Sequence, residues 1–238
     1  MKKVFPITVF LSLFSNLVAA NSIPHLKIEY SYGLDMYCPQ KVEPEVLTPI
    51  QTALIPKIPE YRTELLSKLQ WFQAQWDQQG SPLLIATVKV IGKPFPMQNL
   101  QAAIFLCPRL PFMGTPLAFN VISYLTSSSR DIPGLGKPMP IFFFISTAFH
   151  EILHKYINNI LEKNPSKILA KLNDSDLYEA HLHLYAVQKL VFESLGLSQL
   201  IPGIGQIEAS HGTDYLRAWK VIHEQPDMKE SLLMELKK

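Results

Sequence analysis

The sequence predicts one α+β domain, in which a small mixed sheet packs on a long buried helix and a helical part follows toward the C-terminus. Three observations favour this fold class. The chain has 238 residues, of which 47% are apolar and 18% charged, as is ordinary for a globular domain. Apolar residues recur at helical spacing before residue 80 and after residue 140. Between these segments lie short β-branched or aromatic runs, separated by Pro and Gly, that are typical of strands.

The first twenty residues have the pattern of a secretory signal peptide. Residues 1–3 form a basic head, residues 4–18 are mostly apolar and uncharged, and Val18 and Ala20 place small side chains where a signal peptidase recognises them. The apolar run is shorter than the roughly 20 residues of a membrane span. We therefore expect an exported protein, periplasmic or secreted, without stable membrane insertion after cleavage. The alternatives are a buried N-terminal helix and an uncleaved anchor.

Residues 21–238 are expected to form the single domain. The full chain holds 22 Lys and Arg against 20 Asp and Glu, and Lys2 and Lys3 leave with the signal peptide, so the mature chain is close to neutral. Nucleic acid is therefore not an expected partner, because phosphate binding needs a basic surface. In an oxidising compartment Cys38 and Cys107 can pair in a disulfide, or each can be buried as a thiol.

The sheet is expected in the first half of the domain. Residues 26–30 alternate in polarity, which predicts a strand. From Pro59 to Gln79 apolar residues recur at helical spacing, and Gly80 is expected to end that helix. Three further strands and a surface loop are predicted to follow: Leu83–Ile91, Ala102–Cys107 and Leu117–Leu125 as strands, and Ser127–Lys137 as the loop.

The second half is predicted to be helical. Each helix is bounded by residues that end helices, such as Asn164-Pro165 and Gly196. The predicted helices are Pro140–Leu161, Asp176–Leu195, Thr213–Glu224 and Met228–Lys238.

The predicted helix Pro140–Leu161 contains the motif HExxH, as His150-Glu151-Ile152-Leu153-His154. Residues four apart share a helix face, so His150 and His154 can bind one ion while Glu151 reaches a water on that ion. The neighbouring residues are strongly apolar, and two His with one Glu are costly in a core unless a metal or hydrogen bonds satisfy them. The motif predicts zinc binding; the alternative is a pair of structural core histidines.

At these residues the sequence resembles the zincin superfamily of zinc metallopeptidases. The resemblance implies a zincin-like fold, zinc bound by His150 and His154, Glu151 as general base, and a peptide or protein substrate. Lys155 departs from the pattern, because an uncharged residue is commoner at that position. The metzincin continuation, a Gly and a third His soon after His154, is absent.

A catalytic zinc needs a third protein ligand. Glu179 follows His154 after 24 intervening residues, a gap that resembles the gluzincin clan and implies Glu179 as that ligand. His183 lies four residues further on, so it could be the ligand with Glu179 hydrogen-bonded behind it. His181 borders the apolar face of the same helix and could also point into the site. The remaining alternative is a solvated Glu179 near a helix N-terminus, with surface histidines.

Two further segments carry weaker signals. In gluzincins a later helix often supplies a His or Tyr that stabilises the oxyanion, and His211 and Tyr215 occupy such a place here; Tyr215 could equally pack on Trp219. In zincins an antiparallel edge strand before the active helix binds the substrate backbone, and residues 114–125 resemble it. The glutamate that aminopeptidases carry there is missing, so an aminopeptidase is not supported.

The expected function is an exported zinc peptidase. Zinc would be held by His150, His154 and Glu179, and catalysis would use Glu151 with His211 and Tyr215. The first alternative is a non-catalytic zinc-binding scaffold or effector module of the cell envelope. The second is a metal-free envelope binding protein in which the HExxH is coincidental.

Overall fold

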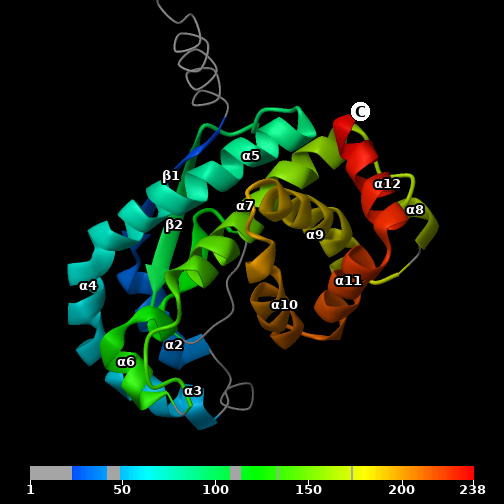
Figure 1. The fold of residues 1–238 in the computed structure, drawn as a ribbon. Coiled ribbons are helices and arrows are strands. Elements are labelled where there is room, and N and C mark those ends of the chain that lie inside the picture. The colour runs from blue at the N-terminus through cyan, green and yellow to red at the C-terminus, as the bar shows by residue number, and fades with distance from the viewer. Residues whose placement is uncertain (1–22, 42–48, 108–113, 133, 173) are drawn as a thin grey trace, which may run out of the picture.

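The computed structural model describes residues 23–41, 49–107, 114–132, 134–172 and 174–238, so the expected signal peptide lies outside the described residues. The α+β class is confirmed, because a small sheet stands among many helices (Figure 1). No described helix is long and apolar enough to cross a membrane.

The sheet has three strands, β1 (His25–Tyr30), β2 (Asn99–Phe105) and β3 (Leu117–Asn120), in the order β1-β2-β3. Both pairs are parallel, with His25 opposite Asn99 and Ala102 opposite Leu117. The expectation of a mixed sheet with an antiparallel edge strand is therefore wrong. β3 does lie at an edge of the sheet, but it runs parallel to β2.

The sheet lacks one predicted strand, since Leu83–Ile91 belongs to helix α5 (Ser81–Ile91). In a short run of apolar residues the hydrophobic pattern has no period, so it cannot distinguish a buried strand from a buried helix. Helical signals flank it, because Pro82 lies in the first turn and Gly92 ends the helix at a φ of 83°.

The helix before α5 does not stop at Gly80 as predicted. α4 (Ile58–Gln75) passes through a π-helical turn, Trp76–Gly80, directly into α5. The Trp76 ring lies against Gly80 so closely that a Cβ there would overlap it. The glycine therefore permits close packing and does not end the helix.

The second half forms the predicted helices and several more. α7 (Ile141–Lys163), α9 (Asp176–Ser194), α11 (Thr213–Glu224) and α12 (Pro226–Lys237) agree with the predictions. In this half α8 (Leu169–Leu172) and α10 (Ile201–Ser210) were not predicted. Before it, the unpredicted α-helices are α2 (Tyr32–Lys41), α3 (Pro49–Leu54) and α6 (Thr126–Asp131).

Residues 117–131 depart from the predicted strand and loop. Asn120 Oδ1 accepts a hydrogen bond from the Ile122 amide at 2.8 Å, which starts a 3₁₀ turn where the strand was expected to continue. The following residues form α6, whose Ser128 and Ser129 are buried. The predicted surface loop is thus partly a packed helix.

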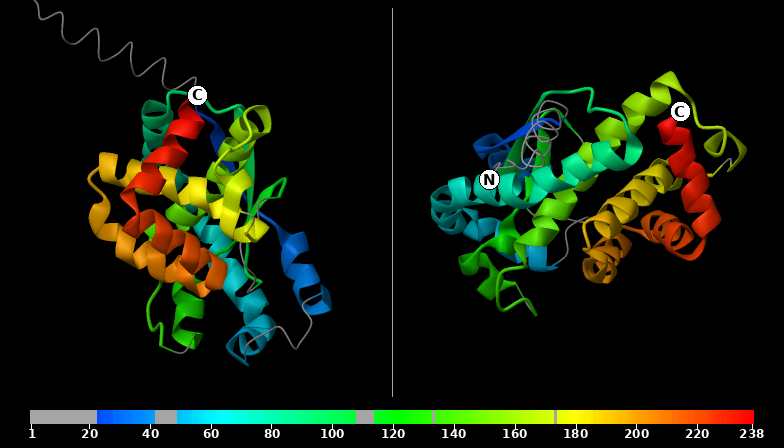
Figure 2. Two further views of the ribbon diagram at one scale, coloured as in Figure 1. Left: turned by 90° about the vertical axis from the view of Figure 1, so that its right-hand side faces the viewer. Right: turned by 45° about the horizontal axis from the view of Figure 1, so that its top comes forward.

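α7 runs between the two parts of the molecule. Figure 1 shows the sheet and α4 on one side of α7 and α9 to α12 on the other, while α5 also packs against α9; Figure 2 shows the second group from the side. Phe144 of α7 joins its neighbours through aromatic contacts with Phe72 of α4, Phe119 of β3 and Tyr124. On the other side, Phe149 of α7 contacts Phe192 of α9, so the motif helix is held from both sides by core packing.

The start of the described chain is fixed to the centre of the sheet. The buried Asp35 of α2 accepts hydrogen bonds from the amides of Leu106 and Cys107, at 2.7 and 3.2 Å, and from the Tyr30 hydroxyl at 2.7 Å. Cys107 is disulfide-bonded; the side chain of Cys38 lies outside the described residues.

Candidate metal centre

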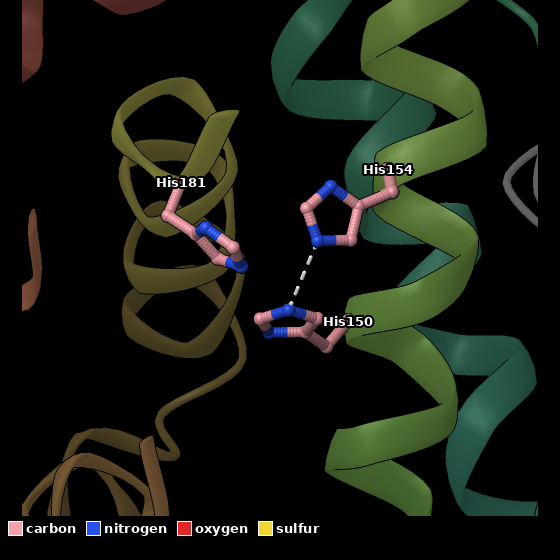
Figure 3. A group of neighbouring side chains, drawn as sticks. All are labelled: His150, His154 and His181. Carbon is pink, nitrogen blue, oxygen red and sulfur yellow. Dashed lines mark hydrogen bonds between the residues drawn. The ribbon is translucent and has the colours of Figure 1, made fainter. Parts of the chain in front are cut away.

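Three buried or half-buried histidines converge from two helices. His150 and His154 lie one turn apart on α7, and His181 faces them from α9 (Figure 3). One ring nitrogen from each lies within 4.8 Å of the others, and the Nε2 atoms of His150 and His154 are 3.2 Å apart. This group could hold a metal ion.

His181 offers an unused nitrogen to this group. Its Nδ1 lies 2.6 Å from the carbonyl oxygen of Leu177, which can only accept, so Nδ1 carries the proton and Nε2 keeps its lone pair. That Nε2 is buried and has no hydrogen-bond partner. An unsatisfied buried acceptor is costly, and a metal ion would satisfy it.

Burial favours the neutral, metal-binding form of two of these rings. Burial lowers the pKa of His154 to about 2 and that of His181 to about 4, with the neighbouring His150 adding to both shifts. Neutral imidazole is the form that binds metal. The protonation state of the pair therefore suits a ligand role.

Glu208 of α10 stands behind His150. It is 4% exposed, its Oε1 lies 3.1 Å from His150 Nδ1, and its Oε2 accepts a hydrogen bond from the Tyr185 hydroxyl at 2.8 Å. Burial alone would raise the pKa of Glu208, but His150, His211 and Tyr185 together hold it well below its ordinary value. Burial would lower the pKa of His150, but the charges of Glu208 and Glu151 raise it above its ordinary value. Glu208 therefore attracts a proton to Nδ1, and a metal at Nε2 would replace the proton on that second nitrogen.

Glu151 is also buried in this group. Burial raises the pKa of its carboxyl, and Glu208 adds to the rise, while the charges of His150, His211 and Lys155 lower it. A carboxyl with a raised pKa beside a metal site is suited to accepting and returning a proton.

The structure does not bring Glu179 into the group, where it was expected as the third ligand. Its Oε1 accepts a hydrogen bond from the Asp174 amide at 3.0 Å, at the N-terminus of α9. Two residues correspond to about 200° around a helix, so Glu179 and His181 face different directions. His183 likewise turns away, and its Nε2 lies 3.2 Å from Oε2 of Glu235 on α12.

His211 and Tyr215 lie beside the three histidines. The Tyr215 ring centroid is 4.3 Å from that of His181 and 5.3 Å from that of His211. Burial raises the pKa of Tyr215, and the charges of Glu151 and Glu208 add to the rise, so its hydroxyl stays protonated and can donate. Trp219 packs on Tyr185 with ring centroids 5.1 Å apart.

Sequence reasoning did not identify Glu208 or Tyr185. Tyr185 follows His181 by four residues, so the helical spacing could have placed it on the same face. Glu208 belongs to α10, a helix that was not predicted because Pro202, Gly203 and Gly205 are poor helix formers. Gly205 packs against Trp219, where a Cβ would overlap the indole ring.

A cavity of about 250 Å³ opens beside the site, next to the part of α7 that comes before His150 in the chain. Its walls are mostly aromatic, apolar or uncharged polar: Phe119, Asn120, Ser123, Tyr124, Met139, Phe144, Thr147, Ile207, Ser210 and His211. It therefore joins the end of β3 to His211.

Comparison of the chain with protein-family models, curated proteins and solved structures finds no match.

Proposed function

We propose that this protein is a zinc-dependent peptidase in which His150, His154 and His181 hold the metal and Glu151 is the general base. The observation that carries the proposal is the convergence of three imidazoles, one with an unpartnered buried Nε2, around a helix turn that also carries Glu151. A set of three nitrogen ligands suits zinc with one open position, whereas calcium and magnesium prefer oxygen.

Each residue of the site has a separate task. A zinc ion in this site would supply a Lewis acid that activates water and polarises a carbonyl. Glu151 takes the proton of the attacking water and returns it to the leaving amine. Tyr215 and His211 are placed to donate to the developing oxyanion, and Glu208 orients His150.

The substrate class rests on two features. The HExxH residues resemble the zincin peptidases, although the ligand from the following helix is His181 here and not the glutamate of the gluzincins. The cavity beside β3 offers a place for a side chain next to an edge strand, and edge strands bind extended peptides by strand addition. Export through residues 1–20, to the periplasm or outside the cell, belongs to the same proposal.

Glu151→Gln separates catalysis from metal binding. The full chain is expressed and purified, zinc is measured by elemental analysis, and hydrolysis is followed on a peptide library. We expect about one zinc per chain in both proteins and a loss of at least about 100-fold in hydrolysis for Glu151→Gln. The control is Glu60→Gln, an exposed glutamate on α4 that is expected to behave like the parent.

Three results would contradict the proposal. Equal hydrolysis by Glu151→Gln and the parent would remove the mechanism. A parent that binds zinc but cleaves no peptide would support a non-catalytic zinc module, and a parent that takes up no zinc after addition would remove the metal site itself.

A further inference from the structure

Lys155 is a charged residue directly after His154 that the proposed chemistry does not use. It is half-buried on α7, and it makes no ion pair or hydrogen bond with any residue that the structure describes. Two other half-buried lysines do have carboxylate partners: Lys68 pairs with Glu64 and Lys229 with Glu193. Partial burial of an unpaired ammonium is unfavourable, so an anion that reaches it gains a favourable interaction.

Lys155 lines two cavities. The first, of about 420 Å³, lies along α7 beyond the histidines and is also lined by Pro96, Met97, Asn158, Asn159 and Glu162. The second, of about 290 Å³, lies at the beginnings of β2 and β3 and is also lined by Asn99, Leu100, Gln101, Gly114, Thr115, Pro116 and Leu117. Lys155 therefore borders both cavities.

The cavity near His211 lies at the other end of the site. On α7 it is lined by Phe144 and Thr147, which precede His150, whereas Lys155 follows His154. β3 runs beside α7 in the opposite sense, since Leu117 lines a cavity with Lys155 and Phe119 lines the cavity with Phe144. No Asp, Glu, Lys or Arg is among the residues that line the cavity near His211. The two ends of the site therefore differ in charge.

We infer that Lys155 determines substrate specificity by binding a carboxylate of the peptide, an inference that rests on the proposed function. Lys155 lies four residues after Glu151, which corresponds to about 6 Å along a helix. An extended peptide advances about 3.3 Å per residue. The carboxylate therefore belongs to a residue one or two positions from the cleaved bond, either as an Asp or Glu side chain or as a free C-terminus.

Lys155 and Glu151 lie four residues apart on α7, so they share a face of the helix. An anion bound at Lys155 is thus close enough to the reacting centre to position the bond that is cleaved. Glu162 lines the larger of the two cavities but forms no ion pair with Lys155, so it leaves the ammonium available.

The test compares matched peptides that differ by one charge. One pair is blocked at both ends and carries Asp or Asn beside the cleaved bond; the other pair ends in a free carboxylate or an amide. We expect the parent to cleave at least one anionic member with a kcat/KM about tenfold higher, mainly through KM. Lys155→Gln is expected to remove the preference, Lys155→Arg to retain most of it, and Lys155→Glu to favour Lys-containing peptides.

The control is Lys171→Gln, which removes an exposed lysine on α8 and is expected to keep the preference of the parent. Binding is measured separately, by fluorescence anisotropy of the labelled peptides with zinc-supplemented Glu151→Gln protein, with and without Lys155→Gln. Binding does not depend on turnover, so it tests Lys155 even if no peptide is hydrolysed.

The outcomes separate the two proposals. Hydrolysis without any preference that depends on Lys155 overturns the inference and leaves the peptidase proposal standing. Preferential binding of anionic peptides that is lost in Lys155→Gln, without hydrolysis, supports the anion site and overturns the peptidase proposal. Equal binding of charged and neutral peptides by both proteins overturns the inference.

Discussion

Glu208 determines how His150 can act. A carboxylate 3.1 Å from Nδ1 attracts a proton to that nitrogen, so Nε2 is the nitrogen that faces the other two histidines and is available to a metal that displaces its proton. The Tyr185 hydroxyl donates to the second oxygen of the same carboxylate, which prevents Glu208 from turning away. Two of the three rings, those of His150 and His181, are therefore orientated by carboxylate and backbone partners before any metal binds.

This arrangement predicts a ranking of metal affinity at the residue scale. His181→Ala is expected to lower zinc affinity the most, because it removes a ligand. Glu208→Gln is expected to weaken affinity by about 10 to 100-fold, as typically follows the loss of an outer carboxylate. Glu179→Ala is expected to change it little, since Glu179 bonds to the Asp174 amide. Competition against a chelator measures all three variants.

The reverse ranking would contradict the three-histidine site. If Glu179→Ala abolished zinc binding and His181→Ala left it nearly unchanged, the glutamate implied by the gluzincin resemblance would be the ligand after all. Circular dichroism of each variant shows whether the loss comes from the site or from unfolding.

The residues of one helix could be predicted from the sequence, but their partner on the next helix could not. His150, Glu151 and His154 share a local spacing that fixes their relation to one another. The choice among Glu179, His181 and His183 depends on how α9 is rotated against α7, which is set by the packing of whole faces. That information is spread over many residues and is absent from the motif.

At the scale of the element, α6 depends on a side chain from another helix. Glu64 of α4 accepts hydrogen bonds from the amides of Thr126 and Ser127, at 2.7 and 2.8 Å, and pairs with Lys68 at 2.6 Å. Burial alone would raise the pKa of Glu64, but the hydrogen bonds from Lys68, Ser127 and Thr126 lower it from 4.5 to about 2. The ionised carboxylate therefore caps the first turn of α6.

This cap predicts a pH dependence of stability. Because the pKa of Glu64 is lower in the folded protein, its contribution is fully present above pH 4.5 and is lost as the pH falls from there toward about 2. Glu64→Gln is expected to lower the free energy of unfolding by about 2 kcal/mol at pH 7, after allowance for partial exposure, and by less at pH 3. Urea unfolding at both pH values measures the difference.

Glu60→Gln on the same helix is the control, and its effect on stability is expected to be small because Glu60 is exposed. A destabilisation by Glu64→Gln that is as large at pH 3 as at pH 7 would show that the carboxylate charge is not what stabilises α6.

Elements with a clear period were predictable, and those fixed by tertiary contacts were not. α7, α9 and α11 carry long apolar periods and were placed within a few residues. α6 has few apolar residues and is capped by Glu64 from 62 positions earlier in the chain, so its own sequence resembles a loop. α5 is a buried apolar run, in which neither the helical period of about 3.6 residues nor the strand period of 2 can be recognised.

For the whole molecule, the site bridges two parts that are otherwise joined by packing. His150 and His154 lie on α7, which contacts the sheet side, and His181 lies on α9, which packs with α11 and α12. A metal that binds only the folded chain therefore stabilises the contact between these parts.

Zinc is thus predicted to raise the unfolding temperature. At a free zinc concentration of about 100 times Kd the gain is about 2.7 kcal/mol, which corresponds to about 5 to 10 °C for a chain of this size. Differential scanning calorimetry with and without a chelator measures the shift. His181→Ala is expected to lose it, and a shift of equal size in that variant would place the stabilising zinc elsewhere.

The position of β1 limits how the protein can mature. β1 begins at His25, only a few residues after the expected cleavage point at Ala20, and it pairs with β2 along its whole length. Its last residue, Tyr30, donates its hydroxyl to Asp35, which in turn holds the end of β2. Proteolysis that removed residues 25–30 would remove β1 from the sheet. The backbone N–H and C=O groups of β2 that pair with β1 would then lose their partners. A cut within or after β1 would therefore remove part of the fold together with the segment before it.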